Sequence, residues 1–344
     1  AIKEENKSFE ELSNILTIEN YLNSQKDGLL QISDTETYKL YELINNIATT
    51  GDDHIELGNE DDVIDSLAGN DYINARAGDN TILSNEGNNT IYSLGGNDTI
   101  TTGLGDDFID AGNGRNTIDA GDGKNTIYTG INNDTITVGE GTNNINAGDG
   151  DNIITTGNGK NSISTGNGKD NITTGAGNDF ISSGAESDEI YSNAGDDTIY
   201  SSSGEDLIDS GDGNDNIFSG TENDVIYAQA GDDKIYSENG DDTIYAGSGN
   251  DYIEAGYGAD KIYSGSGNDT INAGAGYDII YYNRGDENDV IEGNELTTSF
   301  NTIRFGSTIS KENITFERIS DDLKINILPL QGTSVTDTIT LKGF

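Results

Sequence analysis

Isoleucine recurs at every ninth position of this chain, from Ile55 to Ile280, with no insertion and no exception. The interval defines 26 consecutive units over residues 48–281, numbered here so that Ile is position 8. Position 4 is Gly in 22 units, position 2 is Gly in 17, and position 6 is Asp in 19 and Asn in the other 7. A disordered chain would not keep one side chain in register over such a length, so the repeat predicts a regular stacked fold.

Each unit divides into a turn and a short strand. Positions 1–6, as in Ala246–Asp251, combine Gly with Asn and Asp, which favour tight bends. Positions 7–9, as in Tyr252–Glu254, send Ile to one face and its neighbours to the other. Because the chain reverses at each turn, two units make one coil of 18 residues, and thirteen coils at the strand spacing of about 4.8 Å give a rod on the order of 60 Å long. We expect an all-β fold, a parallel β-roll (β-solenoid).

The composition excludes several kinds of partner. Sixty-three acidic and 17 basic side chains give a formal net charge of -46, which repels nucleic acid and anionic lipid. No apolar run approaches the roughly 20 residues that span a bilayer. There is no Cys, which excludes disulfides and thiolate metal sites. The chain begins at Ala1 without a signal-peptide pattern, and we expect it to be part of a larger polypeptide.

Position 6 is the candidate metal ligand. Units two apart lie on the same edge, so their position-6 residues stack 18 residues apart. Paired carboxylates surrounded by carbonyls of Gly-rich turns form an all-oxygen cage, which suits Ca²⁺ better than Mg²⁺. Transition metals favour imidazole or thiolate ligands, and the chain has one His and no Cys.

The units resemble the glycine-rich nonapeptide GGxGxDxUx of the RTX family, the hemolysin-type calcium-binding repeats. Examples are Ala246–Glu254 (AGSGNDYIE), Ser264–Asn272 (SGSGNDTIN) and Thr102–Asp110 (TGLGDDFID). The resemblance implies a parallel β-roll with one Ca²⁺ for each stacked pair of turns, held by the position-6 Asp and turn carbonyls. It also implies type I secretion, with folding deferred until the chain meets extracellular calcium.

Asn and Asp are unevenly distributed at position 6. Of the 24 stacked pairs, twelve contain two Asp, ten are mixed, and two, Asn125/Asn143 and Asn143/Asn161, contain no carboxylate. About twelve strong Ca²⁺ sites are therefore expected, with a metal-poor segment at about 80–161; drift between tolerated side chains is the alternative. The expected metal ligands are Asp53, Asp71, Asp170, Asp179, Asp188, Asp197, Asp206, Asp215, Asp224, Asp233, Asp242, Asp251, Asp260, Asp269 and Asp278.

The two ends depart from the repeat. Residues 1–47 are expected to form a small helical N-terminal cap, or else a linker, with capping boxes at Ser8–Glu11 and Ser33–Glu36 that begin helices. Residues 282–344 are expected to form a β-strand C-terminal capping flank. Its alternating runs are 301–305, 313–318, 323–328 and 337–341.

Two outward features have a structural and a functional interpretation. Tyr227, Tyr245, Tyr263 and Tyr281 are spaced 18 apart and predict a ring ladder, which either stabilises the sheet or contacts a sugar or protein. Thr-x-Thr pairs, as in ice-binding solenoids, do not recur on successive coils.

The expected function is that of a calcium-binding RTX β-roll in a secreted bacterial protein, extracellular or at the cell surface. Its expected partners are calcium ions, the type I secretion machinery and a host-cell or cell-surface glycan or protein. The alternative is a calcium-stabilised surface-layer or adhesin spacer. No enzymatic role is expected, because His54 lies at an outward position and the sequence has no HExxH or GxSxG motif.

Overall fold

The computed structural model describes residues 29–31, 37–39, 48–293, 300–329 and 336–343, and the chain separates into two compact units, 1–48 and 49–344. In the first unit, β1 (Leu29–Gln31) pairs antiparallel with β2 (Thr37–Lys39). The expected helix that begins at Ser33–Glu36 is therefore wrong at Thr37–Lys39, where Thr and Tyr favour an extended backbone. The helix expected after Ser8–Glu11 lies outside the described residues.

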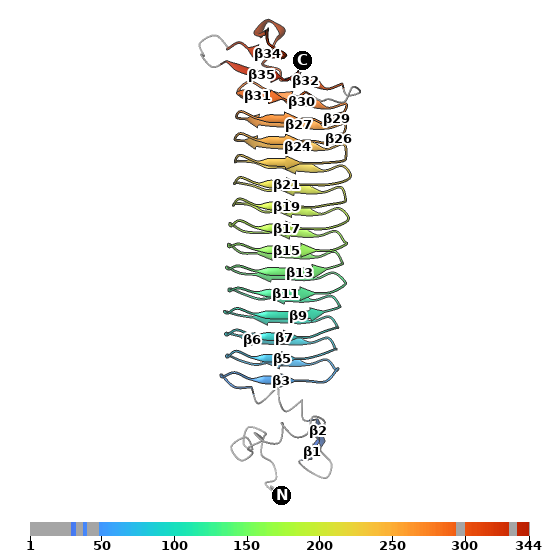
Figure 1. Ribbon diagram of the computed structural model, residues 1–344. Helices are drawn as coiled ribbons and strands as arrows, with labels where there is room; N and C mark the ends of the chain where they lie inside the picture. The colour runs from blue at the N-terminus through green and yellow to red at the C-terminus, as the bar shows by residue number, and fades with distance from the viewer. Residues whose placement is uncertain (1–28, 32–36, 40–47, 294–299, 330–335, 344) are drawn as a thin grey trace. The chain divides into compact units, whose positions relative to one another are not determined.

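The second unit is a stack of coils with a strand on each of two opposing faces (Figure 1). We call the two parallel arrays the first and second ladders. The first ladder contains β3 (His54–Glu56), β5 (Tyr72–Asn74), β7 (Thr90–Tyr92), β9 (Phe108–Gly112), β11 (Thr126–Thr129), β13 (Asn144–Gly148), β15 (Ser162–Thr165), β17 (Phe180–Ser182), β19 (Thr198–Tyr200), β21 (Asn216–Phe218), β23 (Lys234–Tyr236), β25 (Tyr252–Glu254), β28 (Thr270–Asn272) and β31 (Asn288–Ile291).

The second ladder faces the first across the interior of the coils. It contains β4 (Val63–Asp65), β6 (Thr81–Asn85), β8 (Thr99–Thr102), β10 (Thr117–Asp119), β12 (Thr135–Val138), β14 (Ile153–Thr156), β16 (Asn171–Thr173), β18 (Glu189–Tyr191), β20 (Leu207–Asp209), β22 (Val225–Tyr227), β24 (Thr243–Ser248), β27 (Lys261–Ser266), β30 (Ile279–Tyr282) and β32 (Thr302–Phe305). The expected all-β parallel solenoid of 18-residue coils is confirmed, with registers such as Ile199↔Ile217 on one face and Ile208↔Ile226 on the other. A short parallel pair, β26 (Tyr257–Gly258) with β29 (Ala275–Gly276), lies outside both ladders.

The core between the ladders consists of the repeated Ile side chains. Every position-8 Ile from Ile55 to Ile280 is at most 3% exposed. Position 1 contributes a second buried layer, which is mostly Ala, Ser or Thr because the chain bends there beside the Ile column. Positions 7 and 9 face outward, as the alternation predicts.

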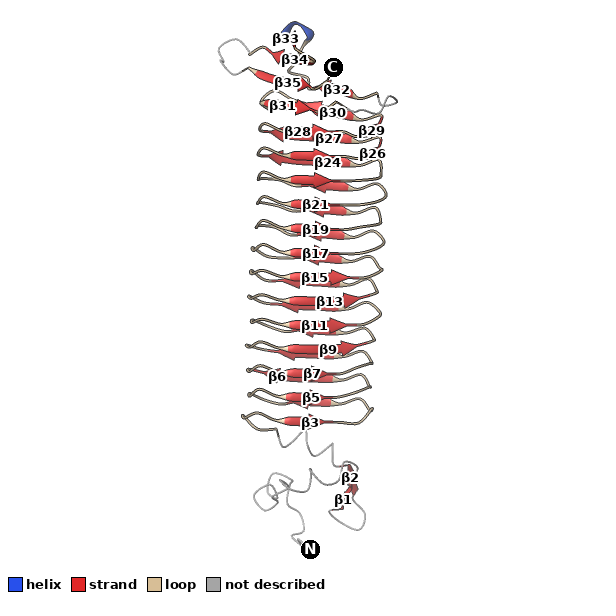
Figure 2. Ribbon diagram, in the orientation of Figure 1, coloured by secondary structure: helices blue, strands red, loops and turns tan. Residues whose placement is uncertain are grey.

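Beyond Ile280 the strands continue the stack and then close it, and Figure 2 shows this region as strands joined by loops and one helical turn. The turn is the 3₁₀ helix η1 (Lys311–Asn313), which the sequence did not predict. It precedes β33 (Ile314–Ile319), which pairs antiparallel with β34 (Asp322–Ile327). β34 pairs antiparallel with β35 (Asp337–Leu341), and β35 adds in parallel to β31. All four expected strand runs of this flank are confirmed within one or two residues at their ends.

The Gly at position 4 is required by the close stacking of the turns. At Gly249, φ is +135°, and an added Cβ would lie 1.8 Å from the carbonyl oxygen of Gly231 in the preceding coil. At Gly285, in the flank, φ is +97° but an added Cβ would meet nothing within 4 Å. Substitution of Gly285 would therefore introduce backbone strain alone, whereas substitution of Gly249 would introduce backbone strain and a clash between stacked turns.

We expect Gly249→Ala to lower the thermal midpoint of the folded protein more than Gly285→Ala. Each substitution carries a strain of about 1–3 kcal/mol from the positive φ, and only Gly249→Ala also forces two coils apart. Thermal unfolding of both variants followed by circular dichroism in excess Ca²⁺ measures the difference. Equal shifts for the two variants would show that the stacking contact is unimportant.

Candidate metal sites

The position-6 side chains form two buried rows, one along each edge of the stack. We call the row 53, 71, 89 and onward to 269 edge A, and the row 62, 80, 98 and onward to 278 edge B. Apart from Asp53, which is half-buried, all of these residues are at most 4% exposed. In each row the backbone N–H of one residue donates to Oδ1 of the residue one coil later, as in Asp197 to Asp215 (2.8 Å) and Asn125 to Asn143 (3.0 Å). One oxygen therefore has the same structural role in Asp and in Asn.

The second atom of the group distinguishes the two residue types. In all seven Asn the Nδ2 amide donates a hydrogen bond, usually to carbonyls of its own turn at positions 2 and 4. Asn116 Nδ2 contacts Gly112 O at 3.3 Å and Gly114 O at 3.0 Å, and Asn152 repeats the arrangement. The corresponding Oδ2 atom of Asp is buried without a hydrogen-bond partner at Asp71, Asp98, Asp107, Asp134, Asp170, Asp179, Asp188, Asp197, Asp206, Asp215, Asp224, Asp233, Asp242, Asp251, Asp260, Asp269 and Asp278.

These orphaned oxygens fit a cation. A carboxylate has the shape of the amide, so its Oδ2 faces the same turn carbonyls to which the amide donates, and all of these atoms are acceptors. A buried acceptor without a partner costs about 1–3 kcal/mol, and more when it is charged. Oxygen ligands of this kind are those of Ca²⁺, which would relieve the cost at each Asp.

Hydroxyl groups at position 1 form hydrogen bonds along the stack and influence the pKa of the position-6 carboxyls beside them. Thr174 and Ser192 each donate to the position-1 carbonyl of the next coil at 2.9 Å, which forms a further ladder inside the turns. The Ser183 hydroxyl donates to Ser201 O, and its proximity also partly offsets the rise that burial causes in the pKa of Asp188. Units with Ala at position 1, such as those of Asp233 and Asp260, have no such hydroxyl.

Burial raises the pKa of the position-6 carboxyls from Asp98 to Asp278. Loss of hydration is the largest cause, and repulsion from the carboxylates one coil away adds to it along the Asp-only rows. The pKa of Asp233 and of Asp260 is raised to about 8, whereas that of Asp242, whose unit has the Ser237 hydroxyl at position 1, is raised to about 6. In the absence of a cation, burial therefore favours the protonated form more strongly at Asp233 and Asp260 than at Asp242.

The structure places all fifteen predicted ligands in the two rows, and fourteen of them are buried. The half-buried one, Asp53, begins edge A, where its carboxylate accepts from the Thr49 N–H (2.8 Å) and hydroxyl (3.1 Å). The rows bring the predicted residues together in pairs 18 apart, each carboxylate lying against the backbone of its neighbour. No group of three or more acidic or His side chains suited to one metal ion occurs among the described residues. Carbonyls must therefore supply the other oxygens at any site.

Sequence reasoning missed some members of the rows. Asp98, Asp107 and Asp134 have the same burial and the same orphaned Oδ2 as the predicted ligands, although their stacked neighbours are Asn. Asp289 extends edge A past the repeat, because its Oδ1 accepts from the Asp269 N–H at 3.1 Å. The Asp-Val-Ile triplet at 289–291 could have revealed it, since it keeps the Asp-x-Ile pattern after an 11-residue step.

The position-5 side chains form an exposed counterpart of the buried rows. Here the N–H donates in the opposite direction, to Oδ1 one coil earlier, as from Asn250 to Asp232 at 2.7 Å. Lys124 and Lys169 donate in the same way, to Asp106 and Asp151. Their side chains offer no acceptor in return, so each interrupts the exposed row.

Aromatic rings stack on both outer faces. The expected ladder of Tyr227, Tyr245, Tyr263 and Tyr281 is confirmed, with centroids 4.1–4.8 Å apart and planes within 12°. The Arg304 guanidinium lies over Tyr281, 5.5 Å from its centroid. Since the ring faces cover one another, the ladder stabilises the sheet and leaves few faces on which a sugar could stack.

A second aromatic ladder on the other face was not predicted. It runs from His54 to Tyr128 and again from Phe180 to Tyr252, with neighbouring centroids 4.5–5.9 Å apart. The rings lie at either position 7 or position 9, so neighbouring rings are 16, 18 or 20 residues apart and the ladder does not keep one position of the repeat.

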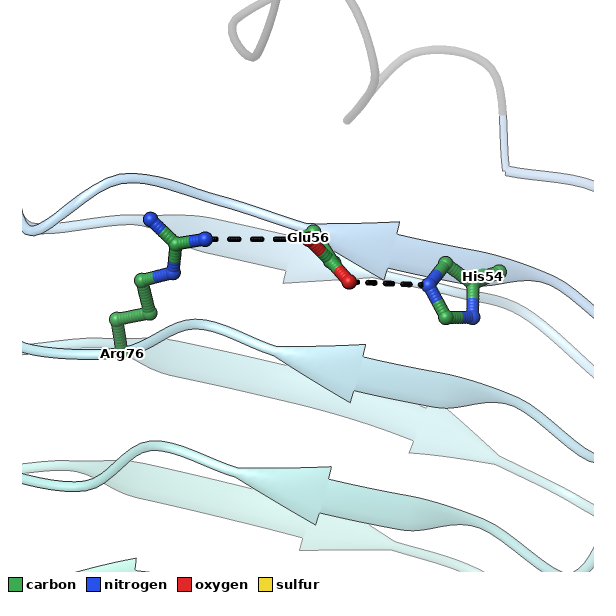
Figure 3. Close-up of polar contacts among 3 residues, drawn as sticks. All are labelled: His54, Glu56 and Arg76. Carbon is green, nitrogen blue, oxygen red and sulfur yellow. Dashed lines mark hydrogen bonds and ion pairs between the residues drawn. The ribbon is translucent and has the colours of Figure 1, made fainter. Parts of the chain in front are cut away.

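His54 lies on the outer surface, as predicted. Its ring stacks on Tyr72, and Nε2 lies 3.3 Å from Glu56 Oε1, which in turn lies beside the Arg76 guanidinium; Figure 3 shows this contact. Glu56 Oε2 and Arg76 are 3.8 Å apart. The three side chains join the first two coils of the first ladder.

Comparison with known proteins agrees with this geometry. The RTX calcium-binding nonapeptide repeat profile, which spans four copies, matches overlapping windows that together cover residues 47–280. The chain belongs to the RTX calcium-binding repeat family. A calcium-binding β-solenoid is thus the common property of this RTX chain and its family.

The comparisons with curated proteins and with solved structures do not bear on the function of the chain. No curated protein matches the RTX chain. Among solved structures, a hyperactive, Ca²⁺-dependent, β-helical antifreeze protein from an Antarctic bacterium is 19% identical over 72% of this chain and 84% of its own, with a TM-score of 0.29. That similarity is too low to bear on function. No helix among the described residues has the length and hydrophobicity needed to cross a membrane.

In calcium-free buffer, we expect the fold to become more stable as pH falls from about 8.5 to about 5. The folded-state pKa values of residues such as Asp233 and Asp260 lie near 8, against 3.8 for an ordinary Asp, so the folded state holds more protons between these values. The stabilisation is complete below the unfolded value and is lost as pH rises through the folded values of about 6 to 8. The far-ultraviolet circular dichroism signal of β structure in EDTA measures it, and this signal should increase as pH falls across the range.

Excess Ca²⁺ serves as the control for this pH series. Protons and Ca²⁺ compete for the same oxygens, so the calcium-loaded protein should lose stability on acidification. An EDTA series in which the β signal is flat, or rises with pH, would contradict the assignment of these carboxyls as buried and uncompensated.

Proposed function

We propose that this chain is the calcium-responsive β-roll of a secreted bacterial protein, extended at low Ca²⁺ and folded at extracellular Ca²⁺. Folding outside the cell would drive type I secretion and would stabilise the parent protein. The RTX repeat is a calcium-binding structural repeat, and we take the described region to support the parent protein rather than to catalyse a reaction.

The observation that carries the proposal is the pair of buried carboxylate rows. From Asp170 to Asp278 every position 6 is an Asp, and each has an Oδ2 without a hydrogen-bond partner. The four ion pairs found among the described residues all lie outside these rows. Buried charges are normally paired or bound to a metal, so these rows require cations or protons to stay folded.

The residues that would hold Ca²⁺ are the fifteen Asp predicted from the repeat, together with carbonyls of positions 2 and 4. Twelve stacked Asp pairs correspond to about twelve strong sites. When bound, each Ca²⁺ supplies two positive charges to one pair, so twelve ions would offset 24 of the 46 net negative charges. In the folded stack the backbone N–H groups hold each Oδ1 in place, which orients Oδ2 toward the site.

The charge of the chain provides the switch. At submicromolar Ca²⁺ the acidic side chains repel one another, and the buried carboxylates without a positive partner oppose folding of the Asp-only coils. At millimolar Ca²⁺ the carboxylate rows are neutralised and adjacent coils dock. A chain kept extended in the cytosol suits export, and we place the folded protein outside the cell or at its surface, with the secretion machinery and a surface glycan or protein as further partners.

The test is a calcium titration of the EDTA-treated chain followed by far-ultraviolet circular dichroism, with bound calcium counted at saturation. We expect a steep transition from coil to β structure that binds about twelve ions, and no equivalent transition with Mg²⁺, which retains its water.

Persistence of the full β signal in EDTA near neutral pH would overturn the switch. It would favour instead a constitutive spacer, as in a surface layer or an adhesin. A transition that binds only one or two ions would contradict the carboxylate rows as the calcium sites.

A further inference from the structure

We propose that residues 113–169 fold without calcium, because Asn amides occupy the place that a cation takes elsewhere in the stack. We call these residues the amide segment. The inference rests on the proposed function, since it requires that the Asp units bind calcium and that the Asn units do not.

The amide segment contains five of the seven position-6 Asn: Asn116, Asn125, Asn143, Asn152 and Asn161. On edge A, Asn125, Asn143 and Asn161 are consecutive, and the Asn143 amide donates to Asn161 Oδ1 at 2.9 Å. Asn161 Nδ2 in turn contacts Gly157 O, Gly159 O and the Thr156 hydroxyl at 3.0–3.3 Å. The carbonyls that would bind a cation are thus already hydrogen-bonded.

Bound calcium at these turns would have to displace those hydrogen bonds. The amide would rotate or move, and its neutral oxygen would replace a carboxylate as ligand. Ca²⁺ affinity depends on the number of charged ligands. Calcium binding at these turns is therefore opposed by the loss of the amide hydrogen bonds and also by the neutral charge of the Asn oxygen. The Asn units are therefore complete without metal.

The charge distribution points in the same direction. Residues 113–169 contain six acidic and four basic side chains, a net charge of -2, whereas residues 170–281 contain 24 acidic and two basic side chains, a net charge of -22. The repulsion that opposes folding of the Asp-only coils is nearly absent from the amide segment.

Strand length gives a third, independent indication. Apart from β10, which has three residues, the strands of the amide segment have four or five residues each, whereas β16 to β23 have three each. The added pairs, such as Val138↔Thr156, extend the backbone ladder into the turn. The Thr129 hydroxyl further donates to Ala147 O at 2.7 Å. More of each coil lies in strands here than over residues 171–236, and only β24 and β27, with six residues each, exceed this length in the Asp-only region.

Stacked repeats contact only their neighbours, so folding can begin at any internal segment and propagate. The amide segment would serve as a preformed template, and calcium would add the Asp coils to its ends. The template lies in the interior of the repeat, with coils to be added on both sides.

Hydrogen exchange measured by mass spectrometry on the full chain, in EDTA and in excess Ca²⁺, tests the inference. We expect peptides from 113–169 to be protected in both buffers and peptides from 170–281 to be protected only in Ca²⁺. Rapid exchange of both regions in EDTA would overturn the inference and leave the calcium switch intact. Protection of both regions in EDTA would overturn the switch and the inference together.

Asn143→Asp tests the amide directly, with Asn144→Asp as the matched control. Both variants add one negative charge, but Asn143 is buried in the row and Asn144 is exposed on the strand. We expect Asn143→Asp to lower protection of the amide segment in EDTA by at least about tenfold, with recovery in Ca²⁺, and Asn144→Asp to leave it unchanged. Equal effects of the two variants would contradict the inference.

Asp134→Asn provides a test that does not depend on a destabilised variant. Asp134 is the one carboxylate at position 6 within the amide segment, and its Oδ2 has no hydrogen-bond partner. Its replacement should increase protection of the segment in EDTA. A decrease would show that the amide does not complete the turn.

Discussion

The fold depends on one hydrogen bond, repeated along each edge, from the backbone N–H at position 6 to the side-chain Oδ1 one coil later. It fixes the coil spacing, satisfies a buried donor and aims the second atom of the group at the turn carbonyls. Because Asp and Asn both provide Oδ1, the stack continues through either residue. The second atom then decides whether a coil is neutral and complete, as at Asn161, or lacks a positive partner, as at Asp179.

This division explains how a regular structure can have an irregular calcium requirement. The Ile core is the same in every coil, so it cannot distinguish one region from another. Asp and Asn at position 6 differ by one charge, and burial gives that charge a much larger free-energy cost than it would have on the surface. Surface charges such as Asp232 lie in water, where hydrogen bonds from Asn250 lower the pKa.

Much of this architecture could be predicted from the sequence. The nine-residue Ile period requires a solenoid, and the alternation of Gly with Asp locates the turns. The orientation of the position-6 group could not be predicted, because it depends on where the backbone N–H of the preceding coil lies. Asp289 was missed because the period breaks before it, and the second aromatic ladder because its rings are divided between positions 7 and 9. Near the N-terminus, a capping-box pattern predicted a helix where Thr37–Lys39 forms a strand.

The most direct test of the central claim is a crystal structure of the calcium-bound chain with an anomalous map that locates each ion. The account predicts ions beside the Oδ2 atoms from Asp170 to Asp278, and none beside Asn125, Asn143 or Asn161. Ions distributed evenly along both edges would contradict the claim that the second atom of position 6 sets the calcium requirement, as would their absence from the Asp-only rows.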